Sequence, residues 1–155
     1  MSRTLVALVA QAVSLAWLAA CAPPAPGPAA LDPQASACRS CRMTIADARF
    51  ASQIVAPGRE PMFFDDLACL RSYLRNGTNV PSQFEVFVAD HRTAEWVKAE
   101  SAVFTRVAGL DTPMGSGVLA HADALSRDAD PVARGGEGVP LSEVAPALRR
   151  STRTP

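Results

Sequence analysis

The chain has 155 residues, and 48% of them are hydrophobic. That length accommodates one domain or two very small ones, with enough apolar material for a core. Lysine plus arginine and aspartate plus glutamate each number 15. A balanced chain lacks the basic surface that attracts nucleic acid, and it offers no polybasic patch for a membrane.

The N-terminus has the pattern of an export signal. Arg3 provides a positive start, an apolar run follows over 5–20, and small residues precede Cys21. The run is shorter than the about 20 residues that a transmembrane helix needs. Leu18-Ala19-Ala20-Cys21 resembles the bacterial lipobox, which implies a signal peptide at 1–20 and lipidation of Cys21. The alternative is an ordinary signal peptide cleaved near Ala20.

A proline-rich segment follows the lipobox. Residues 22–37 contain five prolines and no aromatic residue, a composition that cannot bury enough surface to fold alone. We therefore expect residues 21–37 to be a lipid-anchored, flexible linker. The folded domain is expected at 38–150, with a frayed tail at 151–155. Such a protein is anchored to a membrane rather than spanning it.

Hydrophobic patterns predict a first unit with the order β, β, α, β over 49–90, and the second half of the chain partly echoes this order in a second unit. In the first unit, β-rich stretches predict strands at 50–57, 60–64 and 84–90. Leu67, Leu70 and Leu74 have helical spacing and predict a helix over 66–75. In the second unit we expect strands at 93–97 and 103–107, an apolar run at 118–120, helices at 122–129 and 141–149, and a glycine loop at 135–138.

The domain begins with the motif Cys38-Arg39-Ser40-Cys41-Arg42-Met43. Thiolates and thioethers are soft ligands that favour Cu(I) over hard cations. A c-type haem site requires histidine at position 42, and structural zinc usually requires a second cysteine pair or paired histidines. Because export leads to an oxidising compartment, a disulfide between Cys38 and Cys41 competes with metal binding. Met43 has a use in a copper site but none in a disulfide.

Met114 is the second candidate sulfur ligand, because a methionine in a Pro-Met-Gly-Ser-Gly turn is poorly placed for a core. His121, seven residues later, could join a site built around it. Asp65 and Asp66 fit best as helix N-cap residues. Cys69 fits better as a small semi-buried residue than as a ligand. The chain shows no nucleophile triad or phosphate-binding loop, so we expect no enzymatic turnover.

Together these pieces resemble the NosL family. The resemblance covers the chain from Cys21 to about Leu148 and follows the family's order. Its segments are the lipobox, the Cys38-x-x-Cys41-x-Met43 motif, Phe64-Asp65-Asp66, Val88-Ala89-Asp90, Glu95-Trp96-Val97-Lys98-Ala99, and Thr112-Pro113-Met114-Gly115-Ser116-Gly117.

The resemblance implies a lipid-anchored copper chaperone that faces the periplasm, with the outer membrane as the expected location. It implies Cu(I) binding at Cys38, Cys41, Met43 and Met114. It also implies an α+β fold of two small ββα(β)-type units in one compact domain, related to part of the organomercurial lyase fold. The expected partners are nitrous oxide reductase, whose copper centres receive the ion, and an assembly machinery with an ABC-type transporter. Arg42 departs from the family, which commonly has glycine there, and its charge would favour ionised thiols.

Two other interpretations of the cysteine pair remain open from the residues alone. Cys38 and Cys41 could serve a thiol-disulfide redox protein, although such a site usually opens a helix within a βαβ unit. A structural lipoprotein with a static disulfide and no metal is the third interpretation. We expect the first function, a periplasmic carrier that binds Cu(I) through sulfur and transfers it to a partner.

Overall fold

The computed structural model describes residues 27–33 and 35–148. The expected signal peptide at 1–20, the expected lipidation site Cys21 and the expected tail at 151–155 lie outside the described residues. Among the helices in the described part of the chain, none is long and apolar enough to cross a membrane.

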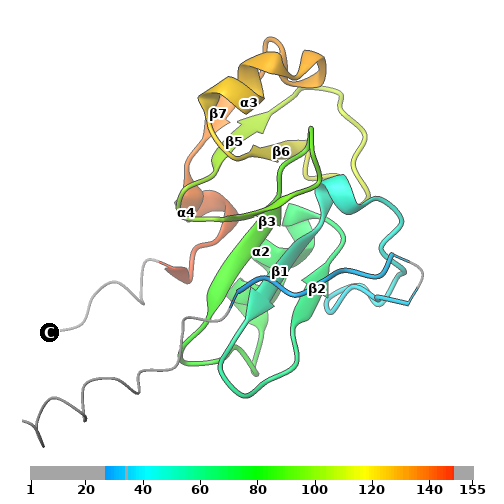
Figure 1. Cartoon of the computed structure of the whole chain (residues 1–155), viewed down its shortest axis with the longest axis vertical. Helices are drawn as coiled ribbons and strands as arrows, with labels where there is room; N and C mark the ends of the chain where they lie inside the picture. The colour runs from blue at the N-terminus through cyan, green and yellow to red at the C-terminus, as the bar shows by residue number, and fades with distance from the viewer. Residues whose placement is uncertain (1–26, 34, 149–155) are drawn as a thin grey trace, which may run out of the picture.

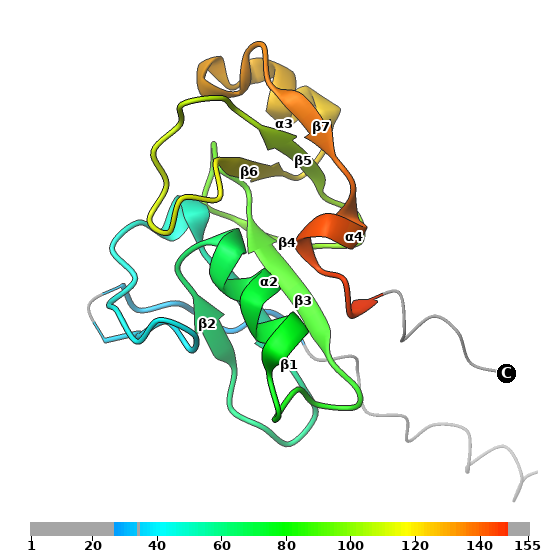
Figure 2. The same cartoon turned by 180° about the vertical axis from the view of Figure 1, so that it is seen from behind.

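The first unit is a four-stranded antiparallel sheet covered on one face by a helix (Figure 2). The strand order is β2-β1-β3-β4, so β1 and β3 lie in the centre. The prediction of two strands, a helix and a third strand is confirmed. The elements are β1 (Ser52–Val55), β2 (Met62–Phe64), α2 (Leu67–Asn76), β3 (Glu85–Ala89) and β4 (Trp96–Lys98).

The strand expected at 93–97 begins later than predicted. Asp90 Oδ1 accepts hydrogen bonds from the backbone N–H groups of Arg92 and Thr93 and closes a turn there. Ala94 in that turn has φ +59°, a left-handed conformation that a strand does not contain. The side chain of Asp90 therefore delays strand pairing until Trp96.

The second unit repeats the topology of the first with a three-stranded antiparallel sheet (Figure 1). Its order, β6-β5-β7, places the first strand between the second and third, as in the first unit. In each unit an aspartate N-cap, Asp66 or Asp123, starts the helix that follows the second strand. The elements are β5 (Val103–Arg106), β6 (Val118–His121), α3 (Ala124–Ala129), the 3₁₀ turn η3 (Pro131–Ala133) and β7 (Glu137–Val139).

Two boundaries in the second unit differ from the prediction. The expected glycine loop at 135–138 is partly strand β7, which pairs with β5. A Cβ at Gly136 would lie 2.8 Å from the Arg106 carbonyl oxygen, so glycine permits this close approach. The helix expected at 141–149 is only α4 (Leu141–Val144), because Pro146 disfavours helical geometry at Ala145.

Both units share one hydrophobic core, which makes the α+β domain continuous. The first sheet and α2 contribute Ile54, Phe64 and Leu70, each without solvent exposure. Phe104 and Val139 of the second sheet belong to the same cluster of buried side chains, as does Val144 of α4. Burial of each such side chain stabilises the fold by about 1.5–3 kcal/mol.

Contacts with the domain begin before Cys38. The Ala29 N–H donates to Gln53 Oε1 at 2.9 Å, and Gln53 Nε2 donates back to the Ala29 carbonyl at 3.1 Å. Leu31 packs against the core, and Ala37 forms a β-bridge with Thr44. The described part of the proline-rich segment is therefore attached to the sheet, whereas its composition predicts a flexible linker.

Candidate metal centre

The cysteine motif forms a closed loop beside β2. The Cys38 N–H donates to the Met43 carbonyl at 2.8 Å, and the Arg42 N–H donates to the Cys38 carbonyl at 3.0 Å. A third backbone bond, from the Arg39 N–H to the Phe63 carbonyl at 2.7 Å, fixes the loop to the strand. These bonds hold Cys38 and Cys41 on one turn whose position is set by the sheet.

Arg42 occupies the strained position of this loop. Its φ is +69°, in the left-handed region where a side chain costs roughly 1–2 kcal/mol and glycine costs little. The backbone therefore explains why glycine suits this position. The side chain of Arg42 is exposed to solvent.

We predict that Arg42→Gly leaves the free energy of unfolding unchanged or raises it by up to about 1 kcal/mol, because relief of strain offsets the extra entropy of the unfolded chain. Arg39→Gly is the matched control: Arg39 has no positive φ, so the same change should lower stability by about 0.5–1 kcal/mol. Urea denaturation measures both. Equal losses in the two variants would contradict the strain argument.

Cys38 and Cys41 of this loop lie beside Asp65 and Cys69, which come from the start of α2. The Sγ atoms of Cys38, Cys41 and Cys69 and a carboxylate oxygen of Asp65 all lie within 4.8 Å of one another. The Cys41 thiol donates to Asp65 at 3.5 Å. The three described cysteines are free thiols, and Cys38 and Cys69 are buried whereas Cys41 is half-buried. This group can hold a metal ion.

The sequence interpretation did not assign Cys69 and Asp65 to the site. The N-cap role expected for the aspartate pair belongs to Asp66, whose carboxylate accepts the Ala68 N–H. Asp65 is thereby free to face Cys41. Cys69 comes three residues after the cap, on the first turn of α2, and this short spacing is the one signal that could have indicated it.

Burial controls the protonation of the inner thiols. It raises the pKa of Cys38 and, reinforced by the neighbouring Asp65 and Cys38, also that of Cys69. Desolvation is the largest cause of the shift at Cys38, so the charge of Arg42 does not set the pKa of that thiol. Both buried cysteines are protonated thiols at neutral pH. A metal ion that binds them must displace their protons.

Asp66 connects the loop that contains Met114 to the start of α2, next to the thiol cluster. Its Oδ2 atom accepts the Thr112 hydroxyl at 2.6 Å and the Met114 N–H at 3.0 Å. Burial acts to raise the pKa of Asp66, but these hydrogen bonds and that from Ala68 outweigh it, so the pKa is lowered and the carboxylate is charged. Adjacent aspartates thus connect Cys41 on one side with the Met114 backbone on the other.

The two methionines lie at the surface. Met43 is 58% exposed and Met114 is 42% exposed. Neither thioether is therefore a core side chain. The inner thiols are shielded and the thioethers face solvent, so the sulfur donors divide into a buried and an exposed set.

We predict that Thr112→Val lowers the free energy of unfolding by about 1.5–3 kcal/mol, because a buried hydrogen bond to a charged carboxylate is lost at nearly constant volume. Thr44→Val, at an exposed position, should change stability by less than about 0.5 kcal/mol. Thermal and urea unfolding measure the difference. An equal effect at both positions would show that Asp66 does not depend on Thr112.

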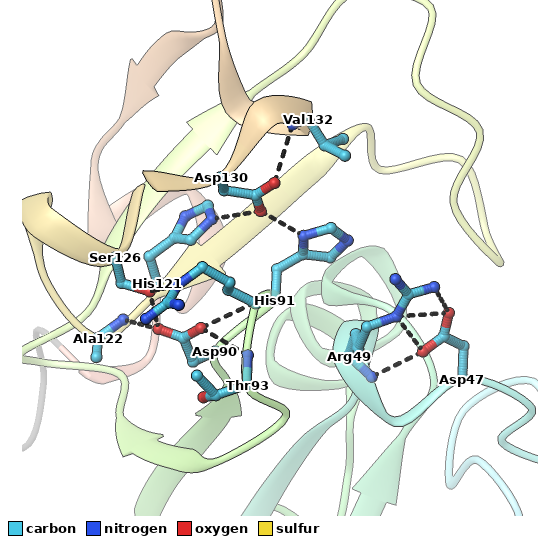
Figure 3. A network of polar contacts seen from close by, with 11 residues as sticks. Asp47, Arg49, Asp90, His91, Thr93, His121, Ala122, Ser126, Asp130 and Val132 are labelled. Carbon is cyan, nitrogen blue, oxygen red and sulfur yellow. Dashed lines mark hydrogen bonds and ion pairs between the residues drawn. The ribbon is translucent and has the colours of Figure 1, made fainter. Parts of the chain in front are cut away.

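His121 lies in another cluster. Its Nε2 atom contacts Asp130 Oδ2 at 3.0 Å, and His91 Nδ1 contacts the same oxygen at 2.6 Å (Figure 3). The sequence suggested that His121 could join Met114; the structure places it with His91 and Asp130 instead. His91 and His121 are distant in sequence and adjacent in the fold because they follow β3 and end β6.

A compact α+β domain that gathers three thiols and displays two thioethers defines a class of protein suited to soft metal ions. A family model, NosL, matches residues 28–148. The chain therefore belongs to the NosL family, a family of copper-binding chaperones and periplasm-facing lipoproteins. No curated protein and no solved structure matches the chain.

Proposed function

We propose that this protein is a periplasm-facing lipoprotein, anchored through Cys21, that carries one Cu(I) ion to nitrous oxide reductase while the copper centres of that enzyme are assembled. Cys38 and Cys41 hold the ion, and Met43 and Met114 complete or exchange its coordination. An ABC-type assembly machinery takes part in the transfer. The observation that carries the proposal is the thiol cluster, with exposed methionines on the two adjoining loops: the Met43 carbonyl accepts the Cys38 N–H, and the Met114 N–H donates to Asp66.

The donor types support a carrier. Thiolates bind Cu(I) strongly, and a thioether is a neutral, weaker soft ligand. A carrier must release its ion to a partner, so the exchangeable donors must be reachable from outside. Met43 and Met114 meet that requirement, whereas Cys38 is 1% exposed. Transfer would begin at the thioethers and end with release from the thiolates.

Zinc is the second candidate for the same residues. Three cysteines and Asp65 form a four-ligand group, and Zn(II) favours tetrahedral sites with thiolate and carboxylate donors. Cu(I) has no use for the carboxylate and gains from the thioethers. The two ions therefore depend on different residues. Loss of Asp65 should weaken a zinc site, and loss of the methionines should weaken a copper site.

The pH dependence of binding tests whether the buried thiols are ligands. Because burial raises the pKa of Cys38, Cu(I) must compete with its proton, and affinity should rise with pH. We expect an increase of about tenfold per pH unit for each thiol deprotonated on binding. Competition with a Cu(I) chelator between pH 6 and 8, with proton release followed by an indicator, measures this slope. A flat profile would exclude the buried thiols.

The decisive experiment is an anaerobic Cu(I) titration of the soluble chain 22–155 against a competing chelator. We expect one ion per chain and loss of binding in Cys38→Ser/Cys41→Ser. Met43→Ala and Met114→Ala should each weaken retention by about tenfold while the fold is kept, since one donor is lost. Met62→Leu is the control, because Met62 Sδ already accepts a hydrogen bond from the Tyr73 hydroxyl at 3.3 Å.

Several outcomes would redirect the assignment. Absence of Cu(I) binding by the fully reduced chain would leave a redox or structural role for the cysteine pair, and turnover in an insulin-reduction assay would identify the redox role. Tighter binding of Zn(II), lost in Asp65→Ala but kept in both methionine variants, would identify a zinc site. Equal affinity of the methionine variants and the native chain would remove the thioethers from the site.

A further inference from the structure

Three potential ligand atoms converge away from the thiol cluster, at the junction of the two sheets. His91 Nδ1 and His121 Nε2 lie 2.6 and 3.0 Å from the same Asp130 oxygen (Figure 3). The three ligand atoms lie within 4.8 Å of one another. All three residues are buried, with exposures of 5%, 0% and 3%. The junction therefore contains a compact donor group of two imidazoles and one carboxylate.

Each ligand comes from a fixed part of the fold. His91 follows β3, and its N–H donates to the Ala120 carbonyl of β6 at 2.8 Å. His121 is the last residue of β6. Asp130 lies between α3 and η3, and its Oδ1 atom accepts the Val132 N–H at 2.9 Å. One carboxylate oxygen is thus used by the backbone, and the other is directed at both imidazoles.

A neighbouring carboxylate shows how this fold builds a purely structural aspartate. Asp90 accepts hydrogen bonds from the backbone N–H groups of Arg92, Thr93 and Ala122 and from the Ser126 hydroxyl, and no imidazole bonds to it in the described part of the chain. Asp130 differs because two histidines share a single oxygen. His121 Nδ1 has no hydrogen-bond partner in the described part of the chain. In the described part of the chain, the one hydrogen-bonding contact of that ring is from Nε2 to Asp130 Oδ2.

We propose that His91, His121 and Asp130 form a site for a borderline divalent cation, with Zn(II) as the occupant. Two imidazoles and one carboxylate with an open fourth position is a known zinc donor set, and imidazole is a poor ligand for Mg²⁺ or Ca²⁺. This set contains no thiolate or thioether, the soft donors that select Cu(I). The site is independent of the proposed copper function and uses none of its residues.

Charge and placement support the assignment. Asp130 is a buried acidic side chain whose Oδ2 atom faces both imidazoles, so a cation at this position has a carboxylate to bind. A bound dication would lie against this carboxylate, with His91 Nδ1 and His121 Nε2 as its other ligand atoms. It would also join the end of β3 in the first sheet to the end of β6 in the second. We therefore expect Zn(II) to stabilise the packing of the two units.

Imidazole ¹⁵N NMR of the native chain during a Zn(II) titration tests the site directly. The chain contains two histidines, so every imidazole signal reports on this cluster even if zinc also binds thiols. We expect the signals of His91 Nδ1 and His121 Nε2 to shift on binding of one ion, because each of these nitrogens exchanges its contact with Asp130 for the metal ion. A parallel titration with Co(II) should give the visible absorption bands of Co(II) bound by nitrogen and oxygen ligands. These bands do not depend on the charge-transfer absorption that sulfur ligands produce.

Asp130→Asn is the first variant, with Asp90→Asn as the matched control, since both change a buried carboxylate to an amide. Loss of a ligand should weaken Zn(II) binding at the histidines by at least about a hundredfold. Mutation of a residue that only hydrogen-bonds to a metal ligand already weakens metal affinity by about 10–100-fold. Asp90→Asn should bind as the native chain does. Unchanged imidazole signals in the native chain, or equal binding by both variants, would overturn the proposal. The native titration decides even if Asp130→Asn fails to fold.

Discussion

The buried carboxylate of Asp66 is the contact on which the rest of the sulfur site depends. It begins α2 by accepting the Ala68 N–H, and it holds the other loop through Thr112 and Met114. Because Asp66 takes the capping role, its neighbour Asp65 can face Cys41. A helix start, a cysteine loop and a methionine loop from three parts of the chain are joined by two consecutive residues.

The sulfur atoms of the candidate site fall into a buried set and an exposed set. Cys38 and Cys69 lie inside, where desolvation raises the pKa of each thiol and keeps it protonated until a metal arrives. Met43 and Met114 lie outside, where a thioether needs no deprotonation to bind an ion. Such an arrangement combines strong retention within the fold with donors that a partner can approach. The chemistry of a carrier requires both.

The two units share a strand order, but they carry different polar groups. Both place an aspartate cap after their second strand, at Asp66 and Asp123. The first unit gathers sulfur and a carboxylate at that position, whereas the second ends β6 in His121, which meets Asp130. One small supersecondary motif therefore supports a soft donor group in one copy and a group of nitrogen and oxygen donors in the other.

Local patterns in the sequence determined the α+β class, the helix at α2, the central strands and the motif Cys38-x-x-Cys41-x-Met43, because periodicity and spacing act over a few residues. Tertiary structure alone decided that Cys69 joins that motif and that His91 meets His121, since these contacts depend on how strands pair. It also set β7, which needs the close approach at Gly136, and the left-handed backbone at Arg42. Spacing identifies the donors, and packing decides which of them come together.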